Sequence, residues 1–146
     1  MPSGSKALSN SDQSGFDFAR EMLAGDPTAG INFDRLQRHP RYGYVIFEYL
    51  LCEAAQRVTP HTSHPRRYWH KNRRKFLSLW RVARDLNAAL FLVNYAKKGT
   101  PHEDEILVIR VKAMDETGIQ SEEIRQYTRA DFQQWFRKLN RECLAE

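Results

Sequence analysis

Two long apolar runs, separated by an amphipathic segment, constrain the fold of this chain more than any other feature. The first run, 44–53, reads Tyr-Val-Ile-Phe-Glu-Tyr-Leu-Leu-Cys-Glu, and the second, 88–96, reads Ala-Ala-Leu-Phe-Leu-Val-Asn-Tyr-Ala. Both runs are apolar at consecutive positions, which is typical of strands covered on both faces. Because a helix is expected between them, the second strand requires a crossover and a parallel neighbour.

Shorter patterns predict the remaining elements. They are a helix over 16–23, a strand over 31–37, a strand over 105–114, a short edge strand over 124–127 and a terminal amphipathic helix that begins after a capping box at Thr128. The expected order is therefore helix, two strands, helix, two strands, a short strand and helix. This order predicts an α/β fold with a central mixed sheet flanked by helices.

The length and composition limit the class of protein. A chain of 146 residues fits one domain, expected here over 15–146, after a polar, serine-rich tail over 1–14 that is expected to be flexible. The chain has no apolar run of membrane-spanning length and no apolar stretch near its start, so neither membrane insertion nor secretion is expected. Cys52 and Cys143 have no metal or redox spacing, which predicts reduced thiols in a cytoplasmic protein.

The excess positive charge comes from one short segment. Positions 66–75 hold six cations and no anion, and without these six the other 17 of the 23 basic residues face 18 acidic ones. The six are Arg66, Arg67, Lys71, Arg73, Arg74 and Lys75. Clustered Lys and Arg on one rigid face are typical of proteins that bind the phosphate backbone of nucleic acids.

A helix over 67–87 would place these charges on one side. The helical period puts Arg67, Lys71, Arg74, Ser78 and Arg81 in one stripe and Trp69, Phe76, Leu79, Trp80, Ala83 and Leu86 on the opposite side. The helix would then pack on the sheet and present its cations outward, with Tyr68 free to stack on an unpaired base. The alternatives are an ordinary solvated helix face and a helix that lies on a membrane surface.

Two acidic residues point to a chemical site. Glu48 interrupts the first apolar run, and an ionised carboxylate in such a strand needs a partner or a metal ion. Asp34 lies in the preceding strand, and a hairpin would bring the two carboxylates side by side, where they could bind Mg²⁺ or Mn²⁺ and a substrate phosphate. The alternative is that Glu48 pairs with a cation such as Arg35.

This arrangement resembles the PD-(D/E)XK nuclease superfamily over roughly residues 16–96. The resemblance rests on Asp34, then on Glu48-Tyr49-Leu50, then on the basic helix and the strand over 88–96. It implies a restriction-endonuclease-like core in which Asp34 and Glu48 bind the divalent metal. Glu21, on the first expected helix, matches an acid that often assists in that family.

The chain departs from this pattern at one position, because Leu50 stands where the family has the lysine that polarises the attacking water. Some members supply the cation from the neighbouring helix, and Lys71 or Lys75 occupies the matching region. The resemblance therefore implies Asp34, Glu48 and one of these two lysines as catalytic residues. The remaining residues expected to contact the nucleic acid are Arg66, Arg67, Arg73, Arg74, Arg81 and Tyr68.

These patterns predict a metal-dependent endonuclease that hydrolyses DNA, acting alone, as a homodimer or with a partner protein. The alternatives are a catalytically inactive domain of the same fold that binds nucleic acid or a protein, and a structural subunit whose basic stripe is covered by a partner. The imidazoles of His61, His64 and His70 with the thiol of Cys52 form a further candidate set, for zinc, although Ser63 and Pro65 also suggest a helix start at this point.

Overall fold

The computed structural model describes residues 13–145, so positions 1–12 of the expected tail over 1–14 lie outside the described residues, and its last position, Ser14, belongs to a helix. The chain divides into two units, the first ending at Asn32 and the second beginning at Phe33. The first contains helix α1 (Ser14–Leu23), as the sequence predicted, and this helix exposes Phe16, Phe18 and Met22. It ends where Ala24 adopts a left-handed conformation, followed by Gly25 with a φ of +96°.

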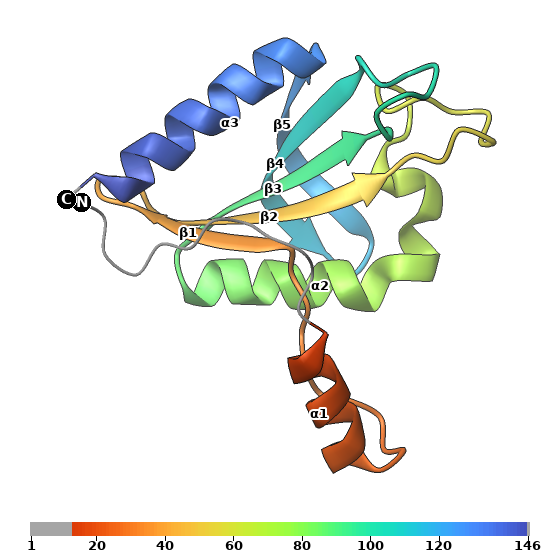
Figure 1. The fold of residues 1–146 in the computed structure, drawn as a ribbon, viewed down its shortest axis with the longest axis vertical. Coiled ribbons are helices and arrows are strands. Elements are labelled where there is room, and N and C mark those ends of the chain that lie inside the picture. Colours follow the sequence, from red (N-terminus) through yellow and green to blue (C-terminus); the bar gives the residue numbers. More distant parts are fainter. Residues whose placement is uncertain (1–12, 146) are drawn as a thin grey trace. The chain divides into compact units, whose positions relative to one another are not determined.

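The second unit is an α/β structure built on a mixed five-stranded sheet (Figure 1). The strands β1 (Arg35–His39), β2 (Gly43–Leu51), β3 (Ala89–Tyr95), β4 (Ile106–Asp115) and β5 (Gly118–Tyr127) lie in sequence order. β2 and β3 pair in parallel and the other neighbours pair antiparallel. The expected crossover between the two apolar runs is therefore confirmed, as is the expected α/β class with a mixed central sheet.

Helices α2 (Trp69–Asp85) and α3 (Arg129–Leu144) cover opposite faces of this sheet (Figure 1). Ile46, Leu90 and Leu92 pack under α2, whereas Phe47 and Val93 pack under α3. Successive side chains of a strand point to opposite faces, which is why both apolar runs lack a polar face. By this alternation Glu48, two positions after Ile46, faces α2.

The bounds of two strands differ most from the sequence prediction. The first strand begins at Arg35 rather than at position 31, because pairing with β2 starts there, and the expected short edge strand is a ten-residue strand that pairs along β4.

The basic helix is not one regular helix. It opens with a 3₁₀ helix, η1 (Pro65–Tyr68), and Asn72 within α2 has the non-helical angles φ −120° and ψ 15°. Leu86, expected on the apolar side, follows the end of α2 and is exposed.

Histidines tie the helices to the sheet. His64, rather than Ser63, caps η1: its Nδ1 accepts the N–H of Arg66 at 3.0 Å, while its Nε2 lies 2.7 Å from the Glu122 carboxylate. The buried His39 contacts Glu142 Oε1 at 2.8 Å, and this hydrogen bond lowers the pKa of Glu142. Within residues 13–145, no helix has the length and apolar character needed to cross a membrane.

Candidate active site

The β1–β2 hairpin brings the two expected carboxylates together. Arg35 pairs with Phe47 in the antiparallel register, so Asp34, one residue earlier, lies opposite Glu48. The backbone N–H of Asp34 donates to Phe47 O at 3.2 Å, and Asp34 Oδ2 accepts the N–H of Tyr49 at 2.7 Å. These two bonds hold the Asp34 carboxylate at the end of β1, beside the strand that carries Glu48.

Glu48 is a buried carboxyl whose proton is strongly held. Its side chain is 4 % exposed, and burial raises its pKa from 4.5 to about 8, because a charged carboxylate loses its hydration there. The neighbouring Asp34 carboxyl raises the pKa further, while the positive charge of Lys75 lowers it. In the part of the chain that the structure describes, Glu48 Oε2 has no hydrogen-bond partner.

Lys75 of α2 supplies a cation to this pair. Its Nζ lies 3.3 Å from Glu48 Oε2, which is ion-pair distance. Leu50 faces the same side of the sheet as Glu48 and packs against the hydrophobic cluster under α2. The charge that the strand lacks at position 50 is therefore present on the helix above it, and Arg35, the other expected partner, instead donates a hydrogen bond to Asn140 at 2.6 Å.

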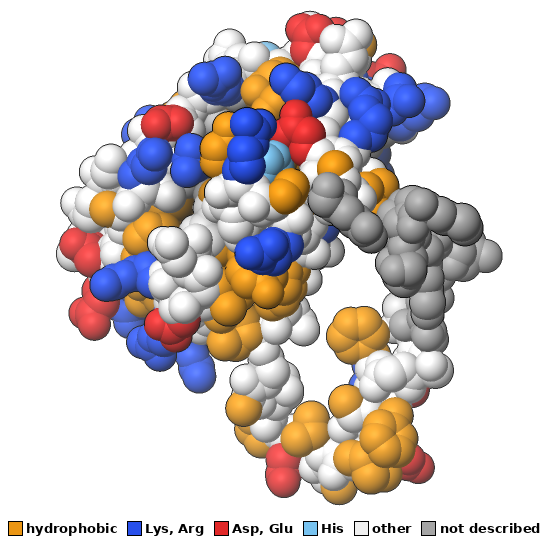
Figure 2. Space-filling model, turned by 90° about the vertical axis from the view of Figure 1, so that its left-hand side faces the viewer, with side chains coloured by type: hydrophobic (Ala, Val, Ile, Leu, Met, Phe, Trp, Pro, Cys, Tyr) orange, Lys and Arg blue, Asp and Glu red, His pale blue; other side chains and the backbone are white. Residues whose placement is uncertain are grey.

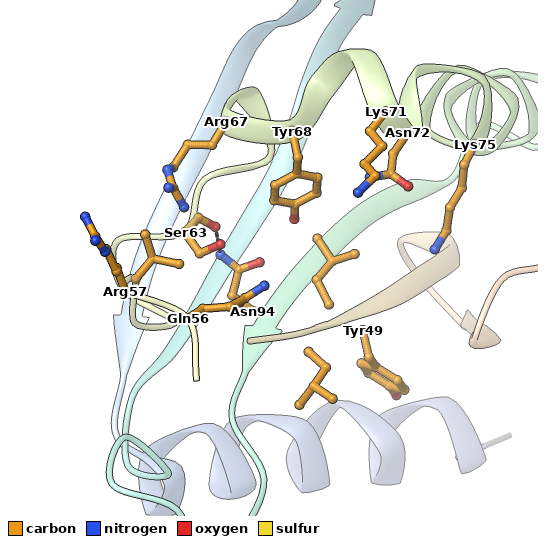
Figure 3. A pocket seen from close by; sticks show the side chains of 13 residues that line it. Tyr49, Gln56, Arg57, Ser63, Arg67, Tyr68, Lys71, Asn72, Lys75 and Asn94 are labelled. Atoms are coloured by element: carbon orange, nitrogen blue, oxygen red, sulfur yellow. Dashed lines mark hydrogen bonds between the residues drawn. The ribbon is translucent and has the colours of Figure 1, made fainter. Parts of the chain in front are cut away.

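A cleft of about 610 Å³ opens beside Lys75, at the ends of β2 and β3 (Figure 3). Four cations line it: Arg57, Arg67, Lys71 and Lys75. No acidic side chain occurs among the described residues that line it, and the other polar ones are Tyr49, Gln56, Ser63, Tyr68, Asn72 and Asn94. Such a lining concentrates positive potential in a concave site, which favours an anionic ligand.

The structure separates the expected cations into two groups. Arg67, Lys71 and Lys75 line the cleft, whereas Arg66, Arg73, Arg74 and Arg81 are exposed and do not belong to its lining. A 3₁₀ turn and the irregular Asn72 interrupt the helical period that the predicted single stripe assumed. On the face that Figure 2 shows, Lys and Arg are interspersed with acidic and hydrophobic side chains.

Tyr68 is held at the mouth of the cleft. Its ring packs against Phe76 with centroids 6.2 Å apart, and burial raises the pKa of its hydroxyl to about 12. The phenol therefore stays protonated and offers a hydrogen-bond donor at neutral pH. The expected core positions Trp69 and Trp80 are buried and half-buried, respectively, so neither is free to stack on a base.

Sequence reasoning missed two residues of the cleft. Arg57 lies in the loop after β2, where a single arginine in a polar segment carries no signal of its own. Asn94 gave a weak signal, because it follows six apolar residues near the end of a buried strand, where α/β sheets place functional groups. Its side chain proves to be buried at the base of the cleft.

Glu21 lies on α1, in the first unit, and is exposed. Within residues 13–145 no three His, Cys, Asp or Glu side chains gather closely enough to hold a metal ion. The expected zinc set is not assembled: His64 contacts Glu122, and the Cys52 thiol donates to Val58 O at 3.2 Å. Both cysteines are free.

Comparison with known proteins identifies no relative of this chain. No family model matches the chain, and neither a curated protein nor a solved structure does.

Proposed function

We propose that this protein hydrolyses phosphodiester bonds of DNA with the help of a divalent metal ion, and that its fold is a variant of the restriction-endonuclease-like core. One observation carries the proposal. Lys75 belongs both to the cation-lined cleft and to the buried carboxylate pair, so it joins a site for a phosphate to a site for a cation.

The cleft provides the binding step. Arg67, Lys71 and Arg57 would hold backbone phosphates, and the absence of acidic side chains in the described lining leaves their charge uncompensated there. Each phosphate that a cation neutralises releases condensed counterions, which drives association with nucleic acid. The exposed cations outside the cleft would add long-range attraction without fixing the position of the backbone.

The carboxylates fit a divalent ion. Asp34 and Glu48 offer hard oxygen ligands on adjacent strands, and Glu48 Oε2 is a buried oxygen without a hydrogen-bond partner in the described chain. Mg²⁺ is commonly held by one or two carboxylates together with substrate phosphates, so this pair is sufficient. When bound, the ion would supply a Lewis acid and a water of lowered pKa.

Lys75 would act at the scissile phosphate. An ammonium group beside the carboxylates and inside the cleft can stabilise the negative charge that develops on phosphate oxygens during attack by water. Tyr49 N–H would act through Asp34, because it holds the Asp34 carboxylate, while Phe47 O holds the backbone of Asp34. In this assignment Lys75 supplies, from α2, the cation that the resemblance implies at position 50.

A second candidate function is a catalytically inactive domain that binds nucleic acid through the same cleft. The observation that favours it is the ion pair between Glu48 and Lys75, since it provides the buried carboxyl with a partner inside the protein. Both candidates predict binding of DNA, and they differ in metal binding and in cleavage.

Cleavage assays with a matched pair of lysine variants test the proposal. We expect the wild type to cleave supercoiled plasmid, linear duplex or single-stranded DNA in Mg²⁺ or Mn²⁺, and Lys75→Met to lose about 100-fold in rate. Lys112→Met is the control, because Lys112 Nζ lies at the same 3.3 Å from a carboxylate, that of Glu123, on the exposed surface. Equal rates for both variants, or no cleavage of any substrate by the wild type, would contradict the nuclease assignment.

The two groups of cations predict different effects on DNA binding. Arg67→Ala should reduce the slope of log affinity against log salt by about 1, because it removes one phosphate contact. Arg73→Ala removes the same charge outside the cleft and should leave that slope nearly unchanged. Fluorescence anisotropy of labelled DNA over a salt series, in EDTA, measures both slopes. Equal slopes for the two variants would show that the cleft does not position the backbone.

A further inference from the structure

Asn94 presents an unused hydrogen-bond acceptor at the base of the cleft. The residue lies near the end of β3, beside Leu50 in the parallel register, and is 1 % exposed. Its Nδ2 donates to Pro60 O at 3.2 Å and also to Ser63 O. Its Oδ1 is fully buried and has no hydrogen-bond partner among residues 13–145.

The orientation of this amide is fixed by its donors. If the amide turned over, Oδ1 would face the carbonyl oxygens of Pro60 and Ser63, and two hydrogen bonds would become repulsive contacts. The acceptor therefore stays on the side away from the loop. In Figure 3 the side chains of Asn94 and Tyr68 approach the cleft from β3 and from η1, with the amide nitrogen of Asn94 toward Ser63.

An unsatisfied buried acceptor is costly unless a ligand or water donates to it. A ligand that enters this cleft must therefore combine a hydrogen-bond donor with negative charge. The donor must be neutral, because Arg57, Arg67, Lys71 and Lys75 would repel an ammonium group at the same place. A nucleotide has this combination, since its phosphates are anionic and its base carries neutral N–H groups.

We propose that the cleft takes up one unpaired nucleotide, whose base donates an exocyclic amino N–H to Asn94 Oδ1 while its flanking phosphates contact Arg67 and Lys71. This inference rests on the proposed function and narrows its substrate to DNA with an unpaired base. In a duplex the remaining amino hydrogen of adenine or cytosine is presented only in the major groove, between stacked neighbours. Asn94 Oδ1 lies buried at the base of the cleft, so only a base that has left the stack can bring its amino group there. A cleft of about 610 Å³ is within the usual size of a ligand site.

The test changes the ligand rather than Asn94, because the amide of Asn94 also holds the loop at Pro60 and Ser63. The probes are fluorescein-labelled 12-mers of deoxyadenosine and deoxycytidine. Each has a partner 12-mer that lacks the exocyclic amino group, built from purine and from 2-pyrimidinone deoxynucleosides, respectively. A 12-mer of abasic residues and a fully paired duplex complete the set, and binding is measured by anisotropy in EDTA.

We expect at least one amino-bearing 12-mer to bind about tenfold more tightly than its partner without the amino group, and more tightly than the duplex. Arg67→Ala should weaken the binding of all probes by a similar factor, because it acts on phosphates.

Equal affinity for the amino, deamino and abasic strands would overturn the inference about Asn94 and leave backbone binding intact. A duplex bound as tightly as the single strands would overturn the requirement for an unpaired base. If no probe binds more tightly to the wild type than to Arg67→Ala, the proposed function fails together with the inference.

Discussion

Replacing Glu48 with glutamine is expected to reduce metal-dependent cleavage by about 1,000-fold or more, because the change removes one of two metal-binding carboxylates. Glutamine keeps the size of the side chain and its burial among the strands. It also resembles the protonated carboxyl, which is the form that a pKa of about 8 favours at neutral pH without metal. The folded structure should therefore be retained while the chemistry is lost.

The matched control is Glu123→Gln, which removes an exposed carboxylate that pairs with Lys112 at the surface. This variant should cleave DNA at the wild-type rate. A second measurement, the melting temperature with and without Mn²⁺, separates metal binding from chemistry. The metal should raise the melting temperature of the wild type and of Glu123→Gln but not that of Glu48→Gln. Cleavage that survives in Glu48→Gln would exclude this residue as a metal ligand.

The unfolding free energy of the metal-free protein is expected to fall between pH 5 and pH 8 because of Glu48. Its pKa is 4.5 in the unfolded chain and about 8 in the folded protein, where Asp34 and Lys75 face it. Below pH 4.5 both states hold the proton, and the contribution of this group to stability is complete. As the pH rises toward 8, the unfolded chain releases the proton and the folded protein retains it, so stability is lost at on the order of 1 kcal/mol per pH unit.

Urea unfolding of the wild type and of Glu48→Gln in EDTA, at intervals from pH 5 to pH 8, measures this effect. The variant has no carboxyl at this position, so its stability should decline less steeply and exceed that of the wild type increasingly toward pH 8. Parallel curves would show that Glu48 is already ionised in the folded protein and that Lys75 compensates its charge.

The raised pKa of Glu48 also means that a metal ion must displace a proton from this residue, so metal affinity should increase from pH 5 to pH 8.

The sequence contained enough to locate the carboxylate pair. Asp34 and Glu48 stand on either side of a tight turn, and the apolar residues around Glu48 in the sequence predict that its side chain is buried. Strand parity then decides that Glu48 and Leu50 share a face, because alternation along a strand does not depend on what packs against it. The helix between two apolar runs determines the parallel pairing for a similar reason, since a helical connection returns the chain to the same edge.

The sequence could not decide which cations meet the carboxylates. Lys71 and Lys75 are one helical turn apart, and the choice of Lys75 depends on where α2 crosses the sheet. The helical period predicts which side chains share a face only for an unbroken helix, and the irregular Asn72 interrupts α2. Arg74 and Arg81 therefore belong to the predicted stripe but not to the cleft.

By itself the sequence determined the features that are local or that follow from strand and helix periods: the α/β class, the parallel pair, the buried acid and the basic segment. Only the tertiary structure decided the features that need distant segments to meet. Arg57 and Asn94 are 37 positions apart in the numbering, yet both line one cleft. The direction of the Asn94 amide is set by the loop carbonyls of Pro60 and Ser63, which accept hydrogen bonds from its nitrogen. Such a contact depends on the path of a loop across the sheet, which no pattern of residue types along the chain specifies.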